Sequence, residues 1–364
     1  MKAEIKFEPI ANWGVKNPKP FIIAGPCSAE SEEQMVETAR GMDLTKVSAF
    51  RAGIWKPRTR PNMFEGVGPV GLQWLRTVKQ ETGLLTATEV ANVKHVYEAL
   101  KAGIDIIWIG ARTTTNPFAV QEIADALQGV DITVLIKNPI NPDVELWVGA
   151  IERIARAGIT KIGAIHRGFS RFEKSAYRNP PHWQIPLDLR RMLPTLPIIC
   201  DPSHIAGTTS LLEDISQRAF DLSYDGLIIE THCNPAVALS GAKQQITPYE
   251  LTRMLGRLAL RTPETNDPTF IQNLEELRGQ IDKLDVEIIR LMGTRMKVSE
   301  EIGKFKKTQS ITIFQAGRWD EIMNKSIELG AAEGLSAEFI SSIFKAIHQE
   351  SINHQTSIMN KKDQ

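Results

Sequence analysis

Short apolar or β-branched runs alternate with helix-like stretches eight times along the first 260 residues, and this alternation limits the fold more than any other feature. Such runs are typical of strands buried on both faces, as in a parallel sheet covered by helices. The predicted strands are residues 21–25, 47–50, 84–88, 106–110, 133–137, 161–165, 197–200 and 226–230. A helix is predicted after each, over 31–42, 71–81, 93–102, 118–127, 144–157, 187–192, 210–219 and 249–260.

Eight strand–helix units in about 240 residues match the size and the count of a (β/α)₈, or TIM, barrel. A doubly wound open α/β sheet is the alternative, because periodicity cannot show whether the sheet closes. The sequence therefore predicts an α/β domain over residues 1–260, with a TIM barrel as its favoured architecture.

The pattern of polar and apolar residues changes after this domain. Residues 261–269 read RTPETNDPT, a polar stretch with two prolines that is typical of a linker. From 270 to 364, apolar residues at three- and four-residue spacing predict one amphipathic helix of about 36 residues and two shorter ones, near 319–333 and 337–358. The long helix would extend roughly 54 Å, too far to bury its apolar stripe within so small a domain. We therefore expect an all-α domain that forms a homodimer.

Composition excludes several classes of protein. The chain has 43 basic and 43 acidic residues, which argues against a binder of nucleic acid or of anionic membranes. Cys27, Cys200 and Cys233 are too few for a disulfide framework and favour a reducing compartment. The sequence shows no signal peptide and no apolar run of the roughly 20 residues that cross a bilayer. We expect a soluble cytoplasmic protein.

Cations gather at the predicted strand ends, where a TIM barrel carries its active site. They are Arg51, Lys56, Arg58, Arg112, Lys137 and Arg167. Any one of them could be a solvated charge. As a set they would repel each other unless an anion lay between them, and forked arginines with lysines suit phosphate and carboxylate groups. The pattern predicts an anion-binding mouth.

A second set of strand-end residues has the chemistry of a metal site. Cys27, His204 and Glu230 follow the first, seventh and eighth strands, which are neighbours in a closed barrel. A thiol, an imidazole and a carboxylate can share one divalent ion. Taken singly, Cys27 would more often be a small buried residue and His204 a hydrogen-bonded loop residue.

The motifs GPCSAES, KPRT, GAR, HRG, DPSH and ETH occur in this order between about residues 20 and 255. As an ordered set they resemble the 3-deoxy-D-arabino-heptulosonate-7-phosphate (DAHP) synthase family in its compact type Iβ form. The opening motif also resembles the 3-deoxy-octulosonate-phosphate synthases, and KPRT favours the DAHP branch. The resemblance implies phosphoenolpyruvate and erythrose 4-phosphate as substrates, with a divalent metal ion, manganese or similar, as cofactor.

The resemblance also implies residue roles. Lys56, Cys27 and His204 would be catalytic, and Cys27, His204 and Glu230 would hold the metal, which polarises the aldehyde oxygen. Phosphoenolpyruvate would be bound by Arg112, Lys137 and Arg167, together with Lys56 and Arg51. Arg58 and Thr59 would bind the phosphate of erythrose 4-phosphate.

The chain departs from this family pattern at two positions. Arg60 stands where the family usually has a small residue. The family's fourth metal ligand is an aspartate in a stretch like ALSDAKQQ, and here that stretch reads ALSGAKQQ with Gly241. Because glycine has no side chain to ligate with, a weakened or inactive barrel is the alternative to a working synthase.

The stretch LRGQIDKLDVEIIRLMGTRMKVSEEIGKFK resembles the helical chorismate mutases, a resemblance that extends over residues 270–358. It implies that Arg278, Arg295, Lys306 and Gln355 are catalytic and that Arg318 and Ser351 bind substrate, with no cofactor. From pattern alone, the cations on the long helix could equally be snorkelling side chains. Gln315 and Trp319 stand where many members carry carboxylates.

Three functions are consistent with these resemblances. The first is a bifunctional enzyme that makes DAHP in the barrel and prephenate in the helices, with feedback of prephenate or chorismate on the barrel. The second is a helical domain that mainly senses such a ligand and dimerises. The third is a barrel disabled by Gly241 beside a working mutase.

Overall fold

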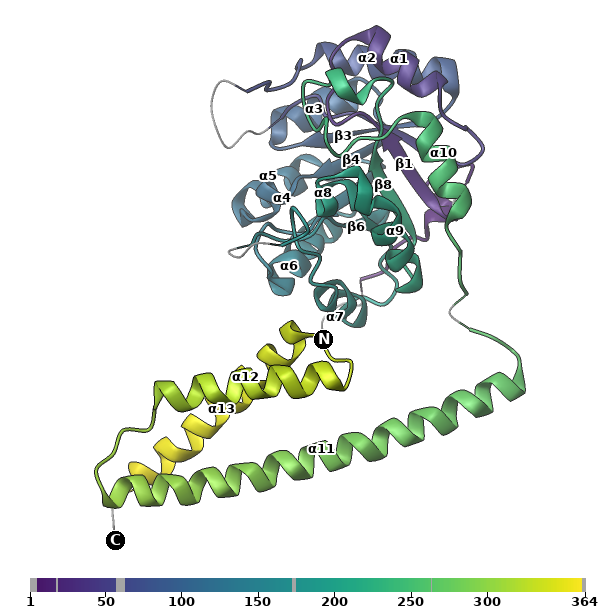
Figure 1. Ribbon diagram of the computed structural model, residues 1–364. Coiled ribbons are helices and arrows are strands. Elements are labelled where there is room, and N and C mark those ends of the chain that lie inside the picture. The colour runs from purple at the N-terminus through teal and green to yellow at the C-terminus, as the bar shows by residue number, and fades with distance from the viewer. Residues whose placement is uncertain (1–4, 18, 57–62, 172–174, 263, 362–364) are drawn as a thin grey trace. The chain divides into compact units, whose positions relative to one another are not determined.

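The computed structural model describes residues 5–17, 19–56, 63–171, 175–262 and 264–361 of the 364-residue chain. The chain divides into two compact units, with the boundary between residues 263 and 264. Figure 1 shows the first as strands enclosed by helices and the second as three helices.

The strands of the first unit form one closed, all-parallel barrel, in which each strand pairs with the next and β1 pairs with β8. Closure confirms the predicted TIM barrel and excludes the open sheet. The strands are β1 Phe21–Gly25, β2 Ala49–Arg51, β3 Leu85–Val90, β4 Ile106–Ile109, β5 Thr133–Lys137, β6 Ile162–His166, β7 Ile198–Cys200 and β8 Gly226–Glu230.

Helices follow the strands around the barrel (Figure 1). They are α1 Glu32–Arg40, α2 Val70–Thr82, α3 Val93–Lys101, α4 Ala111–Thr114, α5 Pro117–Ala126, α6 Val144–Arg156, α7 Gln184–Met192, α8 Pro202–Ala206, α9 Leu212–Asp221 and α10 Pro248–Arg257. The short helices α4 and α8 were not predicted, because elements of four and five residues carry no readable periodicity.

Side chains alternate between the two sides of the barrel wall. On β4, Ile106 and Trp108 lie in the core inside the barrel, whereas Ile107 and Ile109 pack in the core between the strands and the helices. Both cores are apolar, which is why the strands read as continuous apolar runs.

Side-chain caps set where several barrel helices begin. The side chains of Ser31, Asn92 and Asp143 accept hydrogen bonds from backbone N–H groups in the first turns of α1, α3 and α6. Thr247 and Glu250 form a capping box at α10. Since each helix follows a strand, these N-termini and their positive dipole ends lie toward the carboxyl ends of the strands, where anions are favoured.

The second unit consists of α11 Pro268–Thr308, α12 Ala316–Ala332 and α13 Ala337–Met359. Helix α11 has 41 residues, slightly more than predicted, because Asp267 caps it and Pro268 fits its first turn. The last two residues of the predicted linker are therefore helical. A Cβ added at Gly303 would lie 3.2 Å from Cα of Gln355, so α11 and α13 approach closely there.

Much of the apolar surface of α11 is exposed in the single chain. The exposed side chains include Phe270, Ile271, Leu277, Ile281, Leu284, Ile288, Ile289 and Leu291, and further along the helix Val298, Ile302 and Phe305. Soluble monomers rarely expose so much contiguous apolar surface. No helix among the described residues combines the length and apolarity needed to span a bilayer.

Candidate active sites

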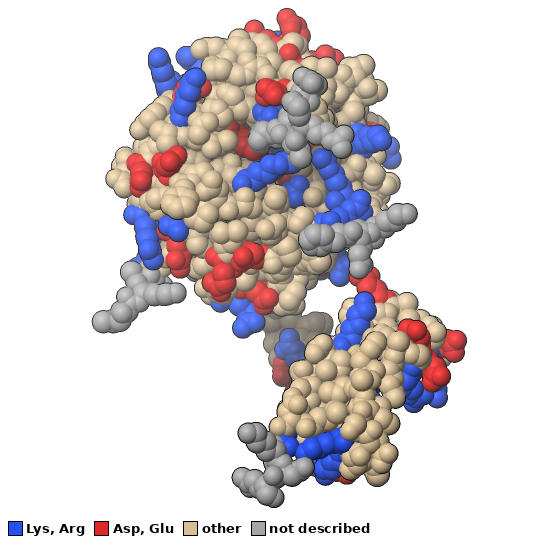
Figure 2. All heavy atoms as spheres, turned by 90° about the vertical axis from the view of Figure 1, so that its left-hand side faces the viewer, with Lys and Arg blue, Asp and Glu red and all other residues tan. Residues whose placement is uncertain are grey.

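A layer of charged side chains closes the carboxyl end of the barrel interior. Arg51 and Lys137 end β2 and β5, Glu230 ends β8, and Asp201 directly follows β7. All four are buried, with Arg51 only 1% exposed and Glu230 fully enclosed. Figure 2 shows the face of the barrel unit that carries α4 and α5, with Lys and Arg side chains gathered near its centre.

Asp201 organises one side of this layer. It caps α8, and its Oδ1 accepts a hydrogen bond from the backbone N–H of His204 at 3.1 Å. Its carboxylate also lies 2.8 Å from Nδ1 of His204 and accepts a hydrogen bond from Nζ of Lys137 at 2.9 Å. Burial opposes its charge, but His204 and Lys137 together hold the pKa of Asp201 well below its usual range. Asp201 therefore remains a carboxylate and fixes both partners.

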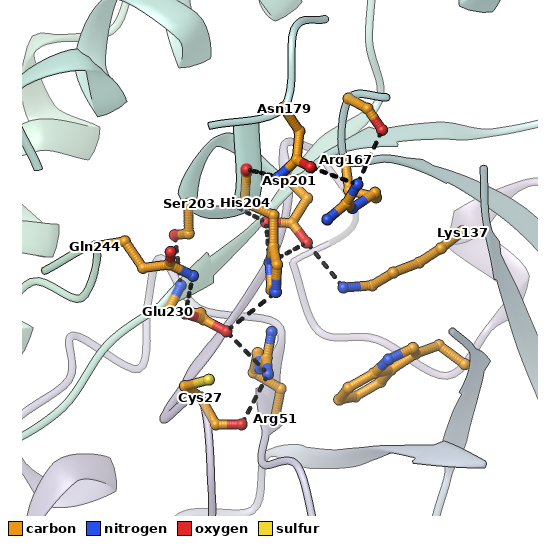
Figure 3. A network of polar contacts seen from close by, with 12 residues as sticks. Cys27, Arg51, Lys137, Arg167, Asn179, Asp201, Ser203, His204, Glu230 and Gln244 are labelled. Atoms are coloured by element: carbon orange, nitrogen blue, oxygen red, sulfur yellow. Dashed lines mark hydrogen bonds and ion pairs between the residues drawn. The ribbon is translucent and has the colours of Figure 1, made fainter. Parts of the chain in front are cut away.

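His204 presents its free nitrogen to Glu230. With Nδ1 turned to Asp201, Nε2 lies 3.7 Å from Oε1 of Glu230, and Figure 3 shows the imidazole between the two carboxylates. Burial lowers the pKa of His204, which favours the neutral ring with a lone pair on Nε2. A neutral, oriented imidazole of this kind is suited to ligate a metal ion.

Glu230 is held as an anion with one free oxygen. Its Oε2 accepts a hydrogen bond from Nε2 of Gln244 at 2.6 Å, whereas its buried Oε1 accepts none from the described residues. Nη2 of Arg51 lies 3.5 Å from Oε1. Burial would raise the pKa of Glu230, but its neighbours His204, Arg51 and Lys56 lower it to about 2.

Cys27 lies beside Glu230 (Figure 3) and is in contact with Lys56. Nζ of Lys56 donates to the backbone carbonyl of Cys27 at 2.7 Å and lies 3.2 Å from its Sγ. A Cβ added at Gly241 would meet Oε2 of Glu230 at 2.9 Å and Sγ of Cys27 at 3.1 Å. Position 241 thus borders both residues, and only the small glycine leaves them undisturbed.

The side chains near Gly241 carry atoms of the types that bind a divalent ion. These atoms are not arranged around a common point. Among the described residues, no three Cys, His, Asp or Glu side chains are arranged so that they could hold a metal ion. The orphaned oxygen of Glu230, the free nitrogen of His204 and the thiol of Cys27 are nevertheless ligand atoms that a borderline metal accepts. Binding would require these side chains to move toward one another.

Arg167 and its neighbours supply further positive charge. Nη1 of Arg167 donates to Oδ1 of Asn179 at 2.9 Å. Burial, together with the charges of Arg178 and Arg112, lowers the pKa of Arg167 to about 10, so it is still a cation at neutral pH. Arg112, in the first turns of α4, is thus close enough to repel it. The predicted residues Arg58 and Thr59, with Arg60, lie outside the described residues.

Sequence reasoning missed several residues of this network. Asp201 belongs to the DPSH motif, but its role depends on the short cap of α8. Gln244 accepts a hydrogen bond from Arg178 at 2.7 Å across a separation of 66 residues, and neither residue stands at a strand end. Only a search for polar side chains in the long loops after β6 and β8 could have found them.

The helical unit brings together three of its predicted site residues. Nη1 of Arg295 on α11 donates to Oγ of Ser351 on α13 at 2.5 Å. Nε2 of Gln355, one turn later, donates to Oγ of Ser299 at 3.0 Å. Oε1 of Gln355 is buried and has no hydrogen-bond partner in the part of the chain that the structure describes. Burial lowers the pKa of Arg295, as expected for a cation held in a partly enclosed site.

The remaining residues of this unit lie in two different settings. Nζ of Lys306 donates to the carbonyl of Ile313 at 2.5 Å, and burial lowers its pKa. Arg278 and Arg318 are exposed and pair with Glu275 and Glu321 on their own helices. His348 was not predicted. Burial and the charge of Arg295 lower its pKa, and its ring stacks on Trp319 at 4.0 Å.

Comparison with known families decides what the first unit is. Residues 11–261 match the DAHP synthetase I family. The chain belongs to this family. Residues 277–356 match the type II chorismate mutase family. The chain is therefore a bifunctional enzyme that joins a DAHP synthase domain to a chorismate mutase domain, as both resemblances predicted.

Individual relatives agree with this assignment for the DAHP synthase domain. The phospho-2-dehydro-3-deoxyheptonate aldolase of Thermotoga maritima is 35% identical over 234 residues, which cover 64% of this chain and 67% of the relative. A 2-dehydro-3-deoxyphosphooctonate aldolase of Variovorax paradoxus is 26% identical, covering 70% of this chain and 94% of the relative.

A solved structure agrees as well. The crystal structure of the Thermotoga maritima DAHP synthase superposes with a TM-score of 0.60 at 33% identity, covering 66% of this chain and 69% of the other. Its truncated form gives a TM-score of 0.58 at 30% identity, covering 66% of this chain and 86% of the other.

Proposed function

We propose that the DAHP synthase domain condenses phosphoenolpyruvate with erythrose 4-phosphate. The observation that carries this proposal is the set of cations at the barrel mouth, where Arg51 and Lys137 are buried and Arg167 lies close to Arg112 and Arg178. The methylene carbon of phosphoenolpyruvate would attack the aldehyde carbon, whose oxygen would take up a proton and become a hydroxyl. Water would add to the neighbouring carbon that bears the phosphate, and phosphate would leave as that carbon becomes a ketone. Cations fixed beforehand on strand ends stabilise the charge that moves.

Specific side chains are proposed for each substrate. Arg112, Lys137 and Arg167, with Lys56 and Arg51, would bind the phosphate and carboxylate of phosphoenolpyruvate through forked and point-charge contacts. Arg58 and Thr59 would bind the phosphate of erythrose 4-phosphate. Because Arg51 and Lys137 are buried and already oriented by Glu230 and Asp201, little reorganisation would accompany binding.

DAHP synthases are generally metal-dependent, and we propose that Cys27, His204 and Glu230 hold a divalent ion, with manganese as the first candidate. When bound, such an ion supplies Lewis-acid polarisation of the aldehyde oxygen. Asp201 would keep the Nε2 lone pair of His204 directed to the ion, and Lys56 would hold Cys27 in place through its contacts with the backbone carbonyl and Sγ. Gly241 contributes no ligand, so the site would have three protein donors.

We also propose that the chorismate mutase domain rearranges chorismate to prephenate without a cofactor. Arg295, held by Ser351, would bind a carboxylate, and Arg318 would assist from α12. Lys306 and Gln355 would donate to the ether oxygen, where negative charge develops as the bond breaks. The partial burial of Arg295, Lys306 and Gln355 supports a site that is ready for an anion.

The mutase domain is proposed to act as a homodimer. The exposed apolar side chains of α11 would be buried against the same helix of a second chain. Arg278 and Arg295 are 17 residues apart on one continuous helix, so about 26 Å separates them. One chorismate cannot touch both from a single chain. Arg278 would therefore complete the site of the partner.

Two further features of this proposal concern regulation and location. Prephenate or chorismate bound to the helices would slow the synthase if one domain arrangement binds the ligand better than another. The cytoplasm is the proposed compartment, because the metal site needs Cys27 as a thiol, which a reducing environment preserves.

The first experiment measures phosphoenolpyruvate consumption with erythrose 4-phosphate, with and without manganese. Wild type should consume phosphoenolpyruvate only when both substrates and the metal are present. Cys27→Ala should abolish this activity, because a metal ligand is lost, while chorismate turnover by the same preparation stays within about twofold of wild type. No consumption by wild type under any metal would instead favour the disabled barrel.

A pair of substitutions tests whether residue 241 faces the metal. Gly241→Asp restores a carboxylate at a positive φ of 69°, which aspartate tolerates better than most residues. It should tighten manganese binding at least about tenfold in calorimetry. Gly241→Ala adds the same crowding next to Cys27 and Glu230 without a ligand and should weaken binding. Equal losses in both variants would mean that residue 241 is not a ligand position.

Feedback is tested in one protein before and after cleavage. A protease site placed between residues 261 and 267 lets the intact enzyme be cut after folding. Prephenate should lower synthase activity of the uncut enzyme by about fivefold or more and should have little effect after the cut, because the coupling is lost. Chorismate turnover serves as the control for intact helices. Equal inhibition of cut and uncut enzyme would place the prephenate effect in the barrel itself.

Mixing two inactive variants tests whether Arg278 completes the site of the partner chain. Arg278→Ala and Arg295→Ala should each be nearly inactive as mutases. Unfolded and refolded together in equal amounts, they should recover about a quarter of wild-type activity, since half the dimers are mixed and each mixed dimer has one intact site. If mass measurement confirms mixed dimers and no activity returns, each site belongs to one chain.

A further inference from the structure

The largest side chain in the upper part of the barrel interior is an indole that none of the proposed roles uses. Trp108 points inward from β4, is fully buried, and lies in register with Glu89 on β3 and Leu135 on β5. Because the rest of β4 is apolar, the sequence alone indicates that Trp108 is a core residue. Its position is nevertheless directly beneath the charged layer, where packing alone does not require an aromatic ring.

Two cations of the phosphoenolpyruvate set lie over this ring. The guanidinium carbon of Arg51 is 4.9 Å from the ring centre, and Nζ of Lys137 is 5.7 Å from it. Both distances fall within the range in which a cation is attracted by the negative face of an indole. The attraction is strongest away from water, and both side chains are at least 95% buried.

Arg51 has hydrogen-bond donors that nothing in the described residues satisfies. Its Nε and Nη1 are buried without a partner, while Nη2 reaches the carbonyl of Cys27 at 3.3 Å and Glu230 at 3.5 Å. Burying a guanidinium with unsatisfied N–H donors costs free energy unless another group stabilises its charge. A ring face can do so, because it attracts the charge and occupies none of the N–H groups.

The indole is itself fixed in place. Its Nε1 donates to Oε2 of Glu89 at 2.9 Å. Glu89 reaches it over Gly110, where any Cβ would lie 2.1 Å from Oε1 of Glu89. A glycine in the GAR motif therefore makes room for the carboxylate that orients Trp108. The negative charge of Glu89 at the indole N–H also increases the electron density of the ring.

We propose that Trp108 is a positioning residue for phosphoenolpyruvate. Its ring face adds to the contacts with Glu230 and Asp201 in holding Arg51 and Lys137, and it occupies none of the N–H donors that the phosphate and carboxylate would use. This inference rests on the proposed function of the barrel. A carboxylate in the place of the indole would hold the cations equally well, but the substrate anion would then have to displace it. A neutral ring face holds them without competing.

The test changes the electrostatics of the ring at constant shape. Tryptophan with one, two or three ring fluorines is incorporated at position 108 of the full chain, which weakens the negative face stepwise and hardly alters packing. Phosphoenolpyruvate binding is measured by calorimetry without erythrose 4-phosphate. The dissociation constant should rise with each fluorine, to about tenfold for the third, while the melting temperature falls only slightly and chorismate turnover stays constant.

Two ordinary substitutions complete the series. Trp108→Phe keeps a weaker face and should raise the dissociation constant a few-fold, whereas Trp108→Leu removes the face and should raise it by about tenfold or more. Trp13→Leu is the matched control, because Trp13 is a buried indole of the same inner core, and no cation of the described residues lies over its ring. It should lower the melting temperature and leave phosphoenolpyruvate binding unchanged.

The outcomes separate this inference from the proposed function. If the dissociation constant of phosphoenolpyruvate does not change with fluorination, or if folded Trp108→Leu binds as tightly as wild type, Trp108 only fills the core. If phosphoenolpyruvate binds wild type but is not consumed with erythrose 4-phosphate and metal, the proposed reaction is wrong, and the fluorine series still decides the role of the ring. If phosphoenolpyruvate does not bind the wild-type enzyme at all, the proposed function and the proposed role of Trp108 are both wrong.

Discussion

A buried row of charged and polar groups holds the mouth of the barrel together, and the rest of the site depends on it. Lys137, Asp201, His204, Glu230 and Arg51 follow one another across the strand ends, and each is in contact with the next (Figure 3). Lys137 pairs with Asp201 and Arg51 pairs with Glu230, one pair on each side of His204, so each of these buried charges has an opposite partner. Removing one member would leave a neighbour uncompensated, which typically costs about 3–5 kcal/mol. The barrel therefore presents Arg51 and Lys137 in fixed positions.

The sequence predicts the strands and strand-end residues of this site better than the contacts among its buried side chains. Apolar runs located the strands to within about two residues, and the rule that active sites lie at strand ends identified Arg51, Lys137, His204 and Glu230. It could not identify Asp201 as the organising residue, since that role arises from a five-residue helix. Nor could it separate Trp108 from the other apolar residues of β4, because the distinction is the presence of two cations over its ring.

The two domains differ in how much of a site one chain can build. In the barrel, eight strand ends converge on one layer, so distant parts of the sequence meet within a single chain. A single long helix cannot converge on itself. Helix α11 holds Arg295 against Ser351 at one end and leaves Arg278 exposed near the other, along with a row of apolar side chains. The same geometry that leaves the proposed mutase site incomplete also provides the surface that would recruit the missing arginine.

Gly241 is best understood through the loop that carries it. This loop is tied to the proposed metal ligands by amides, since Gln245 accepts a hydrogen bond from the backbone N–H of Cys27 at 2.9 Å and Gln244 donates to Glu230 at 2.6 Å. Ser240 adds a hydrogen bond to Ser28. The loop thus does not need an aspartate on the metal to keep its position. Its glycine turns at a positive φ and lets the backbone approach Cys27 and Glu230 closely. In this arrangement residues 240–245 orient the proposed ligands from outside, and a metal held by three protein donors would keep an additional position for water or substrate.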